Sequence, residues 1–93
     1  MAESVLGSLC RETDWIWRRL IQIRSSQQRC SNSHLLNRLQ AEFDIRITRC
    51  GEIQKISQRF HNQSKVRSLN LQFLDELVRR ALSVTSHKSM IHP

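Results

Sequence analysis

Apolar residues near the N-terminus recur every three or four positions, which is the spacing of one face of an α-helix. The series is Leu6, Leu9, Thr13, Ile16, Leu20 and Ile23. Alternating steps of three and four form a heptad seam, the pattern by which helices pack against other helices. We therefore expect a helix from about Glu3 to about Gln28. Gly7 is its weakest point, and Thr13 offers an alternative start because its hydroxyl could cap the following segment.

Both tryptophans of the chain lie inside this segment, in the run Trp15-Ile16-Trp17-Arg18-Arg19. Trp17 falls on the flank of the seam, and Trp15 falls on a different face of the same helix. Only two further helices are expected to cover this surface. We therefore predict that Trp15 and Trp17 are not both buried within a single copy, and that an exposed tryptophan marks a contact surface.

The next segment carries two overlapping patterns. After a polar loop around Cys30 to Asn32, which Ser31 or Ser33 would close as a helix cap, residues 44–51 alternate between apolar and polar positions as a strand does. A longer series is spaced by three and four: Leu36, Leu39, Phe43, Ile47, Cys50, Ile53, Ile56 and Phe60. The longer series favours one helix from about Ser33 to about His61, bent near Gly51, and the strand at 44–51 stays as the alternative.

A second polar break at residues 62–67 precedes a final amphipathic segment. We expect Ser68 or Asn70 to cap this helix, which would end at about Ser83 and contain an Asp75–Arg79 ion pair. Its apolar side is Leu71, Leu74, Leu77, Val78, Ala81 and Leu82. The domain prediction is one helical domain over residues 1–86, followed by a flexible tail at 87–93.

These segments predict an all-α fold, a small helical bundle of two long helices and one shorter helix with coiled-coil-like packing. The composition agrees, because two Gly and one Pro among 93 residues are too few for the turns of a β-rich fold. A chain of this length forms one domain, and long helices expose much of their surface unless they pack together. We therefore expect stabilisation by a second copy or by a different helical subunit.

The chain is strongly basic, with 15 Lys and Arg against 8 Asp and Glu, a net charge of +7. Such a charge favours an acidic partner, either nucleic acid or an acidic helix of another protein. A basic cluster that could bind phosphate comprises Arg46, Arg49, Lys55, Arg59, Lys65 and Arg67. The alternative is a solvated helix face whose arginines pair with Glu42, Asp44 and Glu52 or with an acidic partner.

The region after the central helix resembles the second half of a histone-fold subunit. The resemblance is carried by the run Val66-Arg67-Ser68-Leu69-Asn70-Leu71-Gln72-Phe73-Leu74-Asp75 and by the apolar stretch Leu77–Leu82 that follows. In that family a basic loop precedes a capped helix, and the subunits dimerise and often bind DNA, so the resemblance implies both properties here. The chain departs from the family in its longer first helix and in a central helix without small residues at the dimer crossing.

Residues that could carry chemistry are scattered. His34, His61, His87 and His92 share no helix face, and Cys10, Cys30 and Cys50 lie twenty residues apart, so neither set forms a metal site or a disulfide framework. Cys50, next to Arg49, is the best candidate nucleophile, but it fits more simply in the core. Reduced thiols favour a nuclear or cytoplasmic location. We expect no enzyme activity, no cofactor and no small-molecule substrate.

No apolar run approaches the roughly 20 residues that span a bilayer, so we expect a soluble chain without a membrane partner. The function that fits best is a helical protein–protein interaction module, a small subunit or adaptor that docks through its heptad seams. The predicted contacts are Leu6, Leu9, Trp15, Ile16, Trp17, Leu20 and Ile23. The alternative is a DNA- or RNA-binding helical subunit that uses the basic cluster between residues 46 and 67.

Overall fold

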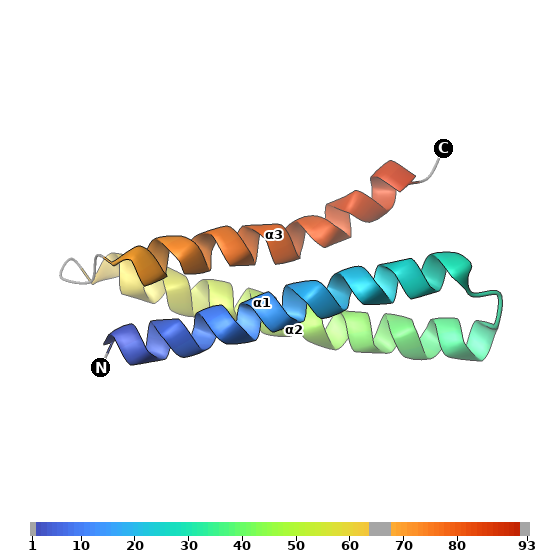
Figure 1. Ribbon diagram of the computed structural model, residues 1–93, viewed down its shortest axis with the longest axis horizontal. Helices are drawn as coiled ribbons and strands as arrows, with labels where there is room; N and C mark the ends of the chain where they lie inside the picture. Colours follow the sequence, from blue (N-terminus) through green and yellow to red (C-terminus); the bar gives the residue numbers. More distant parts are fainter. Residues whose placement is uncertain (1, 64–67, 92–93) are drawn as a thin grey trace.

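Three α-helices make up the chain in the computed structural model, which describes the backbone of residues 2–63 and 68–91 and the side chains of 2–63 and 68–85. They are α1 (Ala2–Arg29), α2 (Ser33–Asn62) and α3 (Leu69–Ile91) (Figure 1). The all-α bundle is confirmed, with α3 the shortest helix at 23 residues. Residues 44–51 lie inside α2, so the alternative of a strand there is wrong.

The helices run up, down and up along one long axis. In Figure 1, α1 and α3 start at the same end of the bundle, and α2 runs antiparallel to both. The result is elongated, 50 × 24 × 16 Å along its principal axes. Of the three helix pairs, α1 and α3 make the most extensive contact.

The heptad seam of α1 is the centre of the bundle core. All six seam residues are buried, and the Thr13 hydroxyl donates a 2.7 Å hydrogen bond to the Leu9 carbonyl, which satisfies its polarity inside the core. Helix α1 already begins at Ala2, so Gly7 does not delay its start and the alternative start at Thr13 is wrong. Tertiary packing of Leu6 and Leu9 outweighs the low helix propensity of one glycine.

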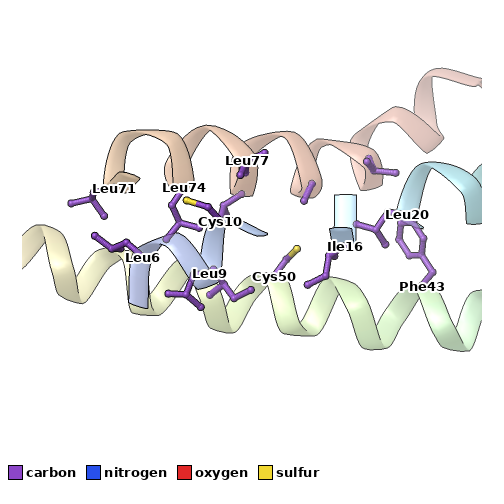
Figure 2. Close-up of a cluster of buried hydrophobic side chains, with 14 of the residues drawn as sticks. Leu6, Leu9, Cys10, Ile16, Leu20, Phe43, Cys50, Leu71, Leu74 and Leu77 are labelled. Atoms are coloured by element: carbon purple, nitrogen blue, oxygen red, sulfur yellow. The ribbon is translucent and has the colours of Figure 1, made fainter. Parts of the chain in front are cut away.

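Side chains from all three helices complete the core, as Figure 2 shows for part of it. Helix α2 contributes Phe43, Cys50 and Ile53 at 0–1% exposure. Helix α3 contributes Leu71, Leu74, Leu77, Val78, Ala81 and Val84. The predicted three-and-four spacings therefore mark the true inner faces of the helices.

Side-chain caps fix where α2 and α3 begin. The Leu35 amide donates to the Asn32 side chain at 3.0 Å, so the cap of α2 is Asn32 rather than Ser31 or Ser33. The Leu71 amide donates to the Ser68 hydroxyl at 3.1 Å, as expected for the cap of α3. Each cap satisfies an amide that a helix start otherwise leaves unpaired.

Helix α3 is longer than expected. It continues through Ile91, eight residues past the expected end at Ser83, and Val84 is still buried against the core. No Gly or Pro lies between Val84 and Ile91, so nothing in the backbone ends the helix there. Most of the predicted tail at 87–93 is thus helical backbone, and residues 92–93 lie outside the described part.

Candidate docking surface

Among the residues whose side chains the structure describes, seven large apolar ones are exposed: Val5, Trp15, Ile21, Leu35, Ile45, Leu69 and Phe73. Trp15 of α1 and Ile45 of α2 are 57% and 70% exposed, and they line the same groove of about 310 Å³ between these two helices. We call this the Trp15–Ile45 groove; its other lining residues are Glu12, Ile16, Glu42, Arg46 and Arg49.

Helical geometry explains why both side chains face outward. Ile16 follows Trp15 by one residue, about 100° round the helix, and is buried at 3% exposure. On α2, Phe43, Ile45 and Ile47 alternate with polar residues as in a strand, but helical geometry turns the three side chains in different directions. Phe43 enters the core, Ile47 packs at its edge, and Ile45 lies on the outer surface.

One wall of the groove is held by Glu42, which binds two arginines. Arg19 of α1 donates to its carboxylate from Nε at 2.6 Å and from Nη2 at 2.7 Å, and Arg46 donates from Nε at 2.9 Å. A bidentate arginine contact is among the strongest and most directional pairings of two side chains. The Arg19 hydrogen bond dominates in lowering the pKa of Glu42 from 4.5 to about 2.

A second ion pair joins the same two helices one heptad away. Arg49 donates to the Glu12 carboxylate from Nε at 2.6 Å and from Nη2 at 2.9 Å, and it lies 3.5 Å from a Glu52 oxygen. This hydrogen bond lowers the pKa of Glu12 and raises the pKa of Arg49. The charges lining the groove therefore largely neutralise each other.

Arg46 also stacks on the aromatic anchor. Its Cζ lies 4.3 Å from the centroid of the Trp15 ring, a cation–π contact, while its Nε binds Glu42. Trp15 is thus exposed yet held in position. An aromatic side chain ordered before binding loses little entropy when a partner arrives.

The predicted partner contacts separate into two groups. Five of them, Leu6, Leu9, Ile16, Leu20 and Ile23, are at most 7% exposed and form the internal core. Trp17 is half-buried against this core, and the Cζ atom of Arg80 in α3 lies 5.7 Å from the centroid of its ring. Trp15 is exposed, in agreement with the prediction that one copy does not bury both tryptophans. The fold thus encloses the seam and leaves Trp15 as the exposed member of the seven predicted contacts.

The predicted basic cluster is not a uniform cationic patch over its described members. Arg46 and Arg49 pair with carboxylates in the groove, whereas Lys55 and Arg59 are exposed. Lys65 and Arg67 lie outside the described residues. The expected pairing of these arginines with Glu42 and Glu52 is present, and the expected Asp44 contact goes instead to Gln40.

Ile45 and Glu12 were missed as members of the site. The only sequence signal for Ile45 is that it falls between the positions of the second helical series, so it is an isoleucine on the polar side of that helix. Glu12 has no sequence signal for its role. Its partner Arg49 lies 37 residues away, and only the packing of α1 on α2 brings them together.

A second polar cluster joins α2 to α3. His61 Nε2 lies 2.5 Å from Asp75 Oδ2, and the Ser57 hydroxyl donates to the other oxygen of the same carboxylate. In a catalytic triad the histidine stands between the other two groups. Here the carboxylate does, so the three side chains do not have the order of a catalytic triad. The predicted Asp75–Arg79 pair is wrong, because Arg79 pairs with Glu76 instead.

Two of the three thiols are in settings that reduce their reactivity. Cys10 and Cys50 are buried, and burial raises the pKa of both, that of Cys50 to about 11. Cys30 lies half-buried in the connection between α1 and α2. Over the described residues, no three His, Cys, Asp or Glu side chains converge as a metal site would require.

Comparison of the chain with protein-family models, curated sequences and solved structures finds no match. Among the described residues, none of the helices has the length and apolar character that crossing a membrane requires. The assignment of function therefore rests on the geometry of the groove.

Proposed function

We propose that this protein is a non-enzymatic helical interaction module, a small subunit or adaptor that docks on another helical protein through the Trp15–Ile45 groove. The predicted class of function is retained, but its contact surface moves from the heptad seam to the outer face of α1 and α2. The buried thiols Cys10 and Cys50 are compatible with a reducing compartment such as the nucleus or cytoplasm.

The observation that carries the proposal is the pairing of two exposed apolar anchors over fixed charges. Trp15 and Ile45 leave more than half of each side chain in water, and Arg46 holds the tryptophan in place. Trp and Arg are the residue types most enriched in interface hot spots, where they are surrounded by contacts that exclude water. Burial of these two side chains by a partner provides hydrophobic free energy that the isolated bundle does not use.

A comparison of tagged variants in cells tests the proposal. Trp15→Ser with Ile45→Ser should remove the specifically bound proteins that the wild-type chain co-purifies, as measured by quantitative mass spectrometry. Ile21→Ser with Phe73→Ser is the control, since these large apolar residues are also exposed, at 45% and 53%, but lie outside the groove. An unchanged set of bound proteins with the groove variant would contradict the proposal.

Nucleic-acid binding is the competing function, and exposed Lys55 and Arg59 favour it. Arg46 and Arg49 are already engaged by carboxylates, which reduces their attraction for phosphate. The histone-fold resemblance is also weakened by a 28-residue α1 packed along α3. Charge reversal at Arg46, Arg49 and Arg59 should abolish binding to duplex DNA if this function is correct, and wild-type affinity should fall steeply with salt.

A further inference from the structure

The carboxylates of this chain are all used internally. Each of the eight Asp and Glu side chains contacts a polar partner of the same chain: Glu3 with Asn70, Glu12 and Glu52 with Arg49, Asp14 with Arg18, Glu42 with Arg19 and Arg46, Asp44 with Gln40, Asp75 with His61, and Glu76 with Arg79. The positive charges outnumber them. Among the described residues, five exposed cations have no carboxylate within ion-pair distance: Arg11, Arg29, Arg38, Lys55 and Arg59.

Four of these cations lie within about 40° of a groove anchor round their own helix. On α1, Arg11 lies four residues before Trp15 and Arg29 lies fourteen residues after it. Both are therefore within about 40° of Trp15 round the helix. On α2, Arg38 lies seven residues before Ile45 and Arg59 lies fourteen residues after it. Both are within about 40° of Ile45 round the helix. The exposed face of the α1–α2 pair is therefore apolar in the middle, and beyond it these cations outnumber the exposed carboxylate of Glu52, which also lies on this face and pairs with Arg49.

The antiparallel register places the cations on both sides of the anchors along the bundle. Arg19 of α1 pairs with Glu42 of α2. Glu12, seven residues before Arg19, pairs with Arg49, seven residues after Glu42. Arg29 therefore lies toward one end of the bundle and Arg59 toward the other. At 1.5 Å per residue each is roughly 20 Å from its anchor, so the face spans about 40 Å.

We propose that the occupant of this face is an amphipathic helix of another protein, with apolar residues over Trp15 and Ile45 and acidic residues toward both of its ends. The inference rests on the proposed docking function and specifies its partner. A helix that spans 40 Å has about 27 residues. The apolar anchors supply most of the affinity, while the flanking charges accelerate association and exclude basic helices.

The same charge distribution argues against two other occupants. A second copy placed face to face would bring cationic flanks against cationic flanks, and its own carboxylates, such as Glu12 and Glu42, are already paired. Nucleic acid would gain nothing from covering Ile45, and its phosphates would meet the carboxylates that line the groove. An acidic helix instead matches both the apolar centre and the basic flanks.

Designed peptides test the charge preference directly. The probe is a 28-residue helical peptide with a Leu/Ile stripe and Glu on both flanks, and its two twins carry Gln or Lys at the Glu positions. The protein is the full chain with Trp17→Phe, which leaves Trp15 as its single tryptophan. We expect the Glu peptide to shift Trp15 emission to the blue and to bind about tenfold or more tighter than the Gln twin, with the Lys twin weakest.

Matched charge reversals locate the contact. Arg38→Glu with Arg59→Glu should weaken the Glu peptide about tenfold and improve the Lys twin. Arg79→Glu with Arg80→Glu changes the net charge equally on the exposed side of α3 and should leave both affinities within about twofold. Circular dichroism of each variant establishes that the bundle is still folded.

The outcomes separate this inference from the docking proposal. Equal binding of the Glu and Gln peptides, with loss in a Trp15→Ser variant as measured by calorimetry, since that variant has no reporter tryptophan, would overturn the acidic partner and support the docking groove. Absence of binding by the Glu peptide up to about millimolar concentration would also overturn the acidic partner. If a 28-base-pair duplex binds more tightly than the Glu peptide and Trp15→Ser does not change its affinity, both the acidic partner and the docking proposal are overturned. A dimer through this face in sedimentation would show that a second copy occupies it, which would overturn the acidic partner.

Discussion

The guanidinium of Arg46 lies over the indole of Trp15, with its Cζ 4.3 Å from the ring centroid. Glu42 holds the same guanidinium from the side through a 2.9 Å hydrogen bond from Nε. The two contacts place an exposed tryptophan and an arginine whose side chain is 22% exposed in one fixed arrangement. They also connect the apolar anchor to the ion pairs that join α1 and α2.

Substitutions on the two faces of α1 should differ in how far they destabilise the fold. Trp15→Ser removes an exposed side chain and one cation–π contact, so it should lower the free energy of unfolding by only about 1 kcal/mol. Leu20→Ala leaves a cavity at a position with 0% exposure and should cost about 2–5 kcal/mol. Urea denaturation measures both values. A larger loss for Trp15→Ser than for Leu20→Ala would show that Trp15 belongs to the core.

Acid should weaken the bundle through Glu42. Its pKa is about 2 in the folded chain, below the ordinary 4.5, so the carboxylate stabilises the fold above pH 4.5 and this stabilisation is lost as the pH falls toward 2. Glu42→Gln should lower stability at pH 7 by about 1 kcal/mol, because solvent screens the pair, and should flatten the acid limb of a Tm-against-pH profile. Glu52→Gln, at a more exposed carboxylate, is the control. An acid limb with the same slope in Glu42→Gln would refute this role.

Thiol labelling should distinguish Cys30 from the other two cysteines. Cys10 and Cys50 are buried with raised pKa values, whereas Cys30 lies in the connection between α1 and α2. A maleimide reagent at neutral pH should add once to the folded chain and three times after unfolding in urea, as read by intact mass. Cys30→Ser should abolish the fast adduct. Rapid labelling of Cys50 in the folded chain would mean that α1, α2 and α3 do not enclose it.

The link between α2 and α3 should behave as a coupled unit. Asp75→Ala leaves the hydroxyl of Ser57, 2% exposed, without its carboxylate acceptor and should destabilise the chain by about 1–3 kcal/mol. Ser57→Ala should then cost less in the Asp75→Ala background than in the wild type. A double-mutant cycle on the free energy of unfolding measures this coupling. Strictly additive effects would show that Ser57 and Asp75 do not depend on each other.

The inner faces of the helices could be predicted from the sequence because their signal is local. The three-and-four spacing from Leu6 to Ile23 marked buried residues, and the longer series through Ile47 selected a helix over a strand at 44–51. The Ser68 cap was likewise readable from one polar residue before an apolar run. The end of α3 was not, because no breaker stands between Ser83 and Ile91 to mark it.

The groove could not be predicted because it depends on how α1 meets α2. The contacts of Glu12 with Arg49 and of Arg19 with Glu42 span 37 and 23 residues, distances at which sequence spacing carries no information. The heptad pattern also could not tell whether the chain itself or a partner covers the seam. The bundle covers it internally, which leaves Trp15 and Ile45 as the exposed apolar pair of the groove.

We propose that a partner protein contacts Trp15 while the bundle stays folded. The most direct test of this proposal is photocrosslinking in cells, with p-benzoylphenylalanine in place of Trp15 or, as the control, in place of Ile21, which is exposed outside the groove. We expect an ultraviolet-dependent adduct to a distinct protein from position 15, absent from position 21 and reduced by Ile45→Ser. No adduct from position 15, or equal adducts from both positions, would contradict it.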